Sequence, residues 1–140
     1  MPLDFPGILG GPEELVAAAS PQTLTALWAD VGSELYVQGA RSVALWIQLD
    51  INGSTNARVR CLAKHESAGA LEYSLPIRTV GASAVLVEEE YVEFNVDADQ
   101  NVILSWDLDG LVPYVQFQAQ VGAVGAHAAQ IDSAVATSAL

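Results

Sequence analysis

The amino-acid sequence predicts an all-β fold, specifically an antiparallel, jelly-roll-like β-sandwich with an extended N-terminal arm. One observation behind this prediction is the alternation in residues 43–51, where every odd-numbered position holds a large apolar residue. A period of two is typical of a half-buried strand, because successive side chains point to opposite faces of a sheet. Residues 102–108 and 115–121 repeat the pattern, and turn-forming residues separate such segments at the spacing of a sandwich.

The chain divides into an arm, residues 1–21, and a sandwich domain, residues 22–140. The first eleven residues contain two prolines and three glycines and show no period, which indicates an extended segment. Residues 12–19 carry the signals of a short helix. A proline stands at the first helical position and two glutamates follow in the first turn.

The sandwich domain is expected to consist of short strands separated by turns. Within one of them the alternation slips at the three glutamates 88–90, which a β-bulge or a change of sheet would explain. We expect the strands, in chain order, at residues 23–29, 34–37, 43–51, 56–65, 71–76, 85–96, 101–108, 113–121 and 128–137.

The dipeptide Asn52-Gly53 is a strong signal for a tight β-hairpin, so residues 43–51 and 56–65 are expected to pair. The returning strand holds three of the five basic residues. On one face beside Gln48 and Asp50, they are expected to form cross-strand ion pairs. A dedicated anion site is the less favoured alternative. These basic residues are Arg58, Arg60 and Lys64.

Composition excludes several classes of function. A chain of 140 residues has the length of one domain, and its net charge of −12 argues against binding to nucleic acid or to an anionic membrane. No signal peptide and no apolar run of membrane-spanning length is recognised. Charged residues make up 16%, against about 25% in typical domains. Either another subunit or partner covers part of the surface, or uncharged polar residues coat it.

Cys61 is the only cysteine, which excludes an intrachain disulfide and a cysteine-based zinc site. Its place in an alternating segment predicts a buried, inert thiol. His65 and His127 have no partners at a convincing metal-ligand spacing and are expected in exposed loops.

Acidic residues near two predicted strand ends raise the possibility of a cation site. The spacing Asp-x-Asp-x-Asn at 97–101 resembles the start of a calcium loop, but Val102 and Leu108 stand where that loop requires glycine and glutamate. A polar turn is therefore the favoured interpretation. A looser cation site remains open, formed by Asp97, Asp99, Asp107 and Asp109.

No set of residues points to catalysis. Glu93 and the glutamates 88–90 lie along one strand with no opposing carboxylate, so a solvated or docking surface is favoured over glycosidase chemistry. No nucleophile elbow, phosphate-binding loop or dinucleotide motif is present. We therefore expect a protein that is not an enzyme and has no cofactor or metal.

Two aromatic residues, Trp46 and Tyr114, are candidate binding residues. Trp46 shares its face of the strand with Gln48 and Asp50, so an exposed indole there would serve a sugar or a protein partner. The favoured interpretation is that both faces of this strand are buried, one by the other sheet and one by the N-terminal arm. Trp106 lies on an apolar face and is expected in the core.

Four segments of the chain resemble small virion structural proteins of tailed bacteriophages. They are residues 42–50, 60–66, 72–76 and 112–119, and the likeness extends over about residues 40 to 137. These proteins are head decoration (cement) proteins or neck and tail accessory proteins, with β-sandwich or jelly-roll domains. The resemblance rests on the general pattern of residues and not on a diagnostic motif. Such families have no catalytic residues to carry over.

The resemblance implies an oligomeric capsid decoration protein that stabilises the head by bridging capsomers. Its partners would be the major capsid protein or other virion proteins, and it would assemble in the host cytoplasm and reside in the virion. The alternatives are a neck or tail accessory protein, or a carbohydrate-binding module with Trp46 or Tyr114 as its platform. Partner contacts are expected at Leu3, Phe5, Ile8 and Leu9 of the arm and at Trp46 and Tyr114.

Overall fold

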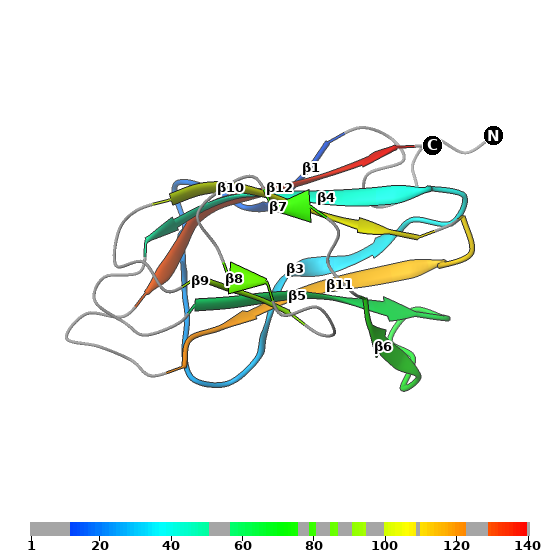
Figure 1. The fold of residues 1–140 in the computed structure, drawn as a ribbon, viewed down its shortest axis with the longest axis horizontal. Coiled ribbons are helices and arrows are strands. Elements are labelled where there is room, and N and C mark those ends of the chain that lie inside the picture. The colour runs from blue at the N-terminus through cyan, green and yellow to red at the C-terminus, as the bar shows by residue number, and fades with distance from the viewer. Residues whose placement is uncertain are drawn as a thin grey trace.

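Two antiparallel β-sheets face each other in the computed structural model, as Figure 1 shows. The structure describes residues 12–50, 57–75, 79–80, 85–86, 91–94, 100–108, 110–122 and 129–139. Within these residues every regular element is a strand, and none is a helix that could cross a bilayer. The prediction of an all-β sandwich is confirmed at this level.

The first sheet, called the β4 sheet, has long central strands and short outer ones. Its strand order is β1 (Glu13–Val16), β12 (Gln130–Ala139), β4 (Ser42–Asp50), β10 (Gln100–Asp107) and β7 (Thr79–Val80), and β2 (Gln22–Thr23) also pairs with β12.

The second sheet is called the β5 sheet. Its strand order is β3 (Ala29–Tyr36), β11 (Tyr114–Gln120), β5 (Ala57–Lys64), β9 (Val92–Phe94) and β8 (Val85–Leu86), and β6 (Glu72–Ser74) also pairs with β5.

The hydrophobic core lies between the sheets, as the alternation predicted. In β4 the side chains of Val43, Leu45, Ile47 and Leu49 are at most 3% exposed. Trp106 of β10 and Phe117 of β11 meet in the middle, with ring centroids 5.4 Å apart. Trp106 and Cys61 are fully buried as predicted, and burial raises the pKa of the Cys61 thiol.

The predicted helix at residues 12–19 is wrong, because this segment contains the edge strand β1. Glu13 pairs with Ala136 of β12, and Val16 is 5% exposed within the core. A helix of eight residues is marginal on its own, whereas a strand gains backbone pairing and buries an apolar side chain. Long-range pairing therefore overrides the local helix signals.

The predicted strand at residues 23–29 is also largely wrong. Only Gln22–Thr23 forms a strand, and β3 begins at Ala29. Between them Leu24 is buried and its amide donates to the carbonyl of Ala129, at 2.8 Å. One buried side chain thus anchors an irregular connection where the sequence suggested a continuous strand.

The predicted hairpin between residues 43–51 and 56–65 does not form, because β4 and β5 belong to different sheets. β4 pairs with β12 and β10, whereas β5 pairs with β11, β6 and β9. Crossing between the sheets lets each strand turn its own apolar face toward a common core. The Asn52-Gly53 dipeptide itself lies outside the described residues.

Four of the remaining strand predictions are confirmed where the structure describes them. The segments expected at 101–108, 113–121 and 128–137 correspond to β10, β11 and β12, and the one at 71–76 contains the shorter β6. The single strand expected at 85–96 is wrong, because this segment contains two short strands, β8 and β9, that pair antiparallel with each other in one sheet. The glutamates 88–90 lie outside the described residues.

Candidate functional site

An apolar row crosses the outer face of the β4 sheet. The register places Trp46 of β4 opposite Ile103 of β10 on one side and Val135 of β12 on the other. Trp46 is 48% exposed and Ile103 is 37% exposed, while Val135 is half-buried. Three apolar side chains from distant parts of the sequence thus form one continuous row, which we call the Trp46 row.

Uncharged polar rows flank the Trp46 row on both sides. On one side Trp46 Nε1 donates to Thr137 Oγ1 at 2.9 Å, which fixes the orientation of the indole. The register sets Ser105, Ala44 and Thr137 along that side. On the other side Asn101, Gln48 and Ser133 form the row. The three rows together are called the Trp46 face, and a hollow of about 370 Å³ lies over part of it.

The charges of the β4 sheet are all of one sign. Its six strands contain no lysine or arginine. Glu14 is exposed opposite Val135, at the edge of the Trp46 face. The acidic residues of these strands are Glu13, Glu14, Asp50, Asp107 and Asp132.

The outer face of the β5 sheet holds basic residues that are already paired. Arg58 Nε donates to Glu93 Oε1 at 2.7 Å, and its guanidinium lies 5.2 Å from the Tyr91 ring centroid. Arg60 Nε donates to Gln118 Oε1 at 2.9 Å, and the Arg60 guanidinium carbon lies 4.1 Å from the ring centroid of Trp28. These contacts join strands and loops into what we call the arginine network.

The cross-strand ion pairs predicted beside Gln48 and Asp50 are wrong, because those two residues lie in the other sheet. Arg58 and Lys64 do form ion pairs, but their acidic partners are Glu93 and Glu34 of the β5 sheet. The prediction failed because it depended on the hairpin that does not form.

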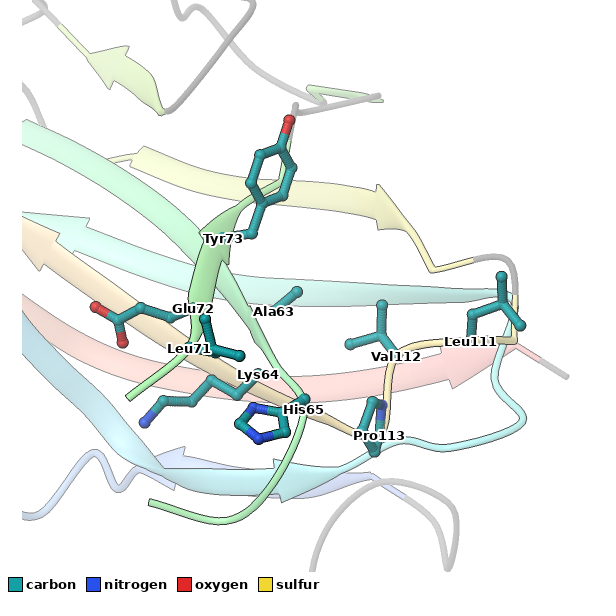
Figure 2. A pocket seen from close by; sticks show the side chains of 9 residues that line it. All are labelled: Ala63, Lys64, His65, Leu71, Glu72, Tyr73, Leu111, Val112 and Pro113. Atoms are coloured by element: carbon teal, nitrogen blue, oxygen red, sulfur yellow. The ribbon is translucent and has the colours of Figure 1, made fainter. Parts of the chain in front are cut away.

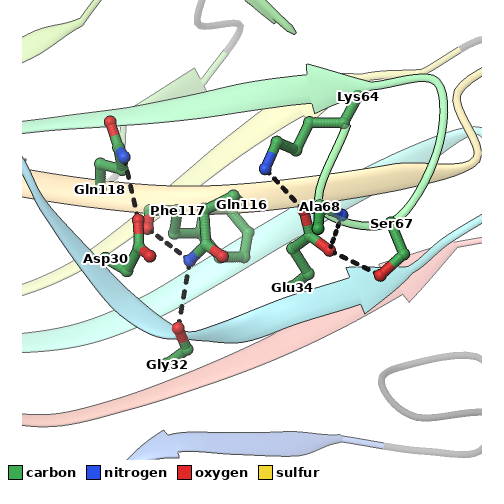
Figure 3. Close-up of polar contacts among 9 residues, drawn as sticks. All are labelled: Asp30, Gly32, Glu34, Lys64, Ser67, Ala68, Gln116, Phe117 and Gln118. Atoms are coloured by element: carbon green, nitrogen blue, oxygen red, sulfur yellow. Dashed lines mark hydrogen bonds and ion pairs between the residues drawn. The ribbon is translucent and has the colours of Figure 1, made fainter. Parts of the chain in front are cut away.

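Glu34 of β3 ties the loop after β5 to the sheet, as Figure 3 shows. Its carboxylate accepts from Lys64 Nζ at 2.6 Å, from Ser67 Oγ at 3.0 Å and from the Ala68 amide at 2.8 Å. Burial alone would raise the pKa of Glu34, but these hydrogen bonds outweigh it and lower the pKa below its ordinary value. The same contact raises the pKa of Lys64.

Gln116 of β11 is another fixed polar group on this face, and Figure 3 shows it beside Gly32. β3 bulges here, because the single residue Gln116 between Val115 and Phe117 faces the three residues 32–34 of β3. Gln116 Nε2 donates to the carbonyls of Gly32 and Phe117, at 3.1 and 3.0 Å. Its side chain is consequently 4% exposed, although alternation predicted an outward polar residue.

A second hollow, of about 310 Å³, lies where β6 meets the connection from β10 to β11, as Figure 2 shows. Three large apolar side chains project around it: Leu71, Tyr73 and Leu111, which are 70%, 68% and 80% exposed. His65 at its rim has an exposed side chain with Nε2 3.4 Å from Glu66 Oε1. The expectation that His65 lies in an exposed loop is confirmed.

The structure separates the predicted binding residues. Trp46 lies on the outer face of the β4 sheet, whereas Tyr114 belongs to the β5 sheet and packs edge-on against Tyr36, with ring centroids 5.3 Å apart. Sequence reasoning missed Ile103 and Val135, because only the strand register places them beside Trp46. The four arm residues expected to bind a partner, Leu3, Phe5, Ile8 and Leu9, lie outside the described residues.

The described part of the chain offers no metal-binding cluster of three His, Cys, Asp or Glu side chains. Of the acidic residues considered for a cation site, only Asp107 is described, and it ends β10. The others, Asp97, Asp99 and Asp109, lie outside the described residues, as does His127.

No family model, no curated protein and no solved structure shows a significant match to the chain. The two outer faces of the sandwich and the strand order are therefore the features that bear on function.

Proposed function

We propose that this protein is a non-enzymatic virion structural protein of a tailed bacteriophage, specifically a capsid decoration protein that stabilises the head by bridging capsomers. The Trp46 face is the observation that supports this proposal. It offers an exposed tryptophan, a second exposed apolar side chain and uncharged polar neighbours on a broad sheet surface. Such a surface suits a protein interface, whose centre is depleted of charge and rich in aromatic residues.

The strand order supports a jelly roll, the fold class expected for this function. Four strands in the order β1-β12-β4-β10 face four in the order β3-β11-β5-β9. Along the chain these eight strands alternate between the sheets except from β5 to β9, which pair directly. Two sheets of four strands joined in this way make the two Greek keys of a jelly roll, an architecture common in viral capsid proteins and lectins.

Bridging through many identical contacts would let each weak contact contribute strongly. Once one copy is bound to the head, further contacts by the same oligomer form at a high effective concentration. A modest apolar face can therefore stabilise a shell if the decoration protein is an oligomer with several copies of that face. In this proposal the protein assembles onto particles in the host cytoplasm and remains in the virion.

The copy number per particle tests this proposal. Purified phage particles would be analysed by quantitative mass spectrometry for the molar ratio of this protein to the major capsid protein. Hundreds of copies per particle are expected for a decoration protein. About a dozen copies would identify a neck or tail accessory protein instead, and absence from particles would contradict both.

A carbohydrate-binding module is the second candidate, and one observation favours it. Gln48, Asn101 and Ser133 lie in a row directly beside Trp46, so an aromatic surface adjoins amide and hydroxyl groups. Sugars are commonly bound by an aromatic face together with such groups. Titration with soluble neutral polysaccharides, followed by tryptophan fluorescence, would show saturable binding that is lost in Trp46→Ala if this candidate is right.

A further inference from the structure

We propose that the partner surface that covers the Trp46 face has an apolar centre and a rim of lysine or arginine residues. The chain would then dock with its β4 sheet toward the partner and its β5 sheet toward solvent. This inference rests on the proposed function, because it describes the chemistry of the virion surface to which the protein binds.

The apolar centre of the partner follows from the Trp46 row. Trp46 and Ile103 are exposed side by side in the middle of a sheet, and the hollow beside them extends over Gln48 and Asn101. The indole N–H is already bonded to Thr137, so the ring presents mainly its apolar surface to a partner. A tryptophan in a central, desolvated position is the residue type that most often dominates binding energy.

The basic rim follows from the charges around that centre. The strands of the β4 sheet contain no lysine or arginine, and the chain has a net charge of −12. Glu14 stands exposed beside Val135, next to the apolar row. Complementary potentials favour docking and like charges oppose it, so positive charge is required around the partner's apolar centre.

A second copy of this chain does not meet that requirement. Two Trp46 faces in contact would bring together two chains of net charge −12, with an exposed Glu14 at the edge of each face. The opposite face of another copy offers Arg58, Arg60 and Lys64, but these side chains already bind Glu93, Gln118 and Glu34. Breaking such charged contacts would offset the gain from new ones. The observations therefore favour a different protein as the partner.

The test measures binding of the full chain to phage particles that were produced without it. Binding would be followed by co-sedimentation at about 50 mM and about 500 mM NaCl. We expect the apparent Kd to rise by about tenfold at the higher salt, because screening weakens attraction between charged rims. Trp46→Ala should raise the Kd by about 30-fold or more, the effect of removing a hot-spot residue.

Two matched controls separate this face from the rest of the surface. Glu14→Lys should raise the Kd several-fold, whereas Glu66→Lys, the same charge change in the loop after β5, should leave it unchanged. Trp46→Ala is matched by Leu27→Gln, which alters a side chain that is 76% exposed in the loop before β3. If Trp46→Ala has a lowered melting temperature, Ile103→Thr serves as a second variant of the Trp46 row.

Different outcomes overturn different statements. Absence of the protein from wild-type particles would overturn the proposed function and this inference with it. Particle binding that is unchanged by Trp46→Ala and Ile103→Thr would overturn the inference alone. Salt-independent binding, self-association that Trp46→Ala abolishes, or saturable polysaccharide binding through Trp46 would each show that the occupant is not a basic-rimmed protein surface.

Discussion

Trp46 and Arg60 occupy comparable positions, each on a central strand and each on the outer face of its sheet. Arg60 is held within the molecule by Gln118 and by the ring of Trp28. Trp46 makes one internal hydrogen bond and leaves almost half of its surface in solvent. The arginine network satisfies its own polar groups and stabilises the fold, whereas the Trp46 face leaves apolar surface whose burial would stabilise a complex.

This difference predicts that equivalent substitutions on the two faces have different consequences. Changes on the face of the β5 sheet should lower the free energy of unfolding and leave partner binding intact. Changes on the Trp46 face should weaken partner binding and leave the free energy of unfolding nearly unchanged.

Glu34→Ala should lower the free energy of unfolding by about 2–3 kcal/mol. It removes the acceptor for Lys64, Ser67 and the Ala68 amide, and leaves the lysine charge mostly buried with no partner at that site. Urea denaturation measures the effect. The matched control Glu14→Ala, on the edge of the β4 sheet, should cause no measurable change, and an equal loss in both variants would contradict the comparison.

Gln116→Met should lower the free energy of unfolding by about 1–2 kcal/mol. The volume is nearly retained, but the carbonyls of Gly32 and Phe117 lose a donor in a buried position. Gln48→Met makes the same chemical change on the Trp46 face, where the side chain is exposed and its contact with Ser133 Oγ is long, at 3.4 Å. We expect Gln48→Met to be nearly neutral in the same denaturation assay, and a reversal of this order would refute the assignment of roles.

The smallest expected effect is a pH dependence of stability from Glu34. Because its folded-state pKa lies below the unfolded value, the unfolded chain binds the proton first as the pH falls. The contribution is therefore complete above the ordinary glutamate pKa and is lost as the pH falls through the lowered one. The stability difference between wild type and Glu34→Gln should shrink from neutral pH to about pH 3, as measured by thermal unfolding. A difference that stays constant with pH would show that the charge of Glu34 does not stabilise the fold.

Much of the fold could be predicted because alternation acts locally. The inward and outward residues of β4, β10 and most of β11 follow from the period of two, and the burial of Trp106 and Cys61 follows with them. Gln116 departs from the pattern because of the bulge in the neighbouring strand β3. The strand β1 departs from its local helix signals because β12 offers it a partner.

The candidate site could be predicted only in part. Trp46 was identified from its position on the polar face of an alternating strand, but Ile103 and Val135 were not, because they lie far away in the sequence. The apolar side chains around the second hollow, Leu71, Tyr73 and Leu111, also come from separate segments. Alternation predicts the face of the sheet to which a side chain points. It does not predict which strand lies next to the strand that carries this side chain.

The sequence alone predicted an all-β sandwich, the inward-facing residues of its clearest strands and a strongly acidic net charge. Only the folded chain shows that β4 and β5 lie in different sheets, that Arg58 and Lys64 find their acidic partners within the β5 sheet, and that Ile103 and Val135 lie on either side of Trp46. The physical reason is the range of the interactions. Side-chain direction is fixed within a few residues, whereas strand pairing depends on which distant segments can bury their apolar faces together.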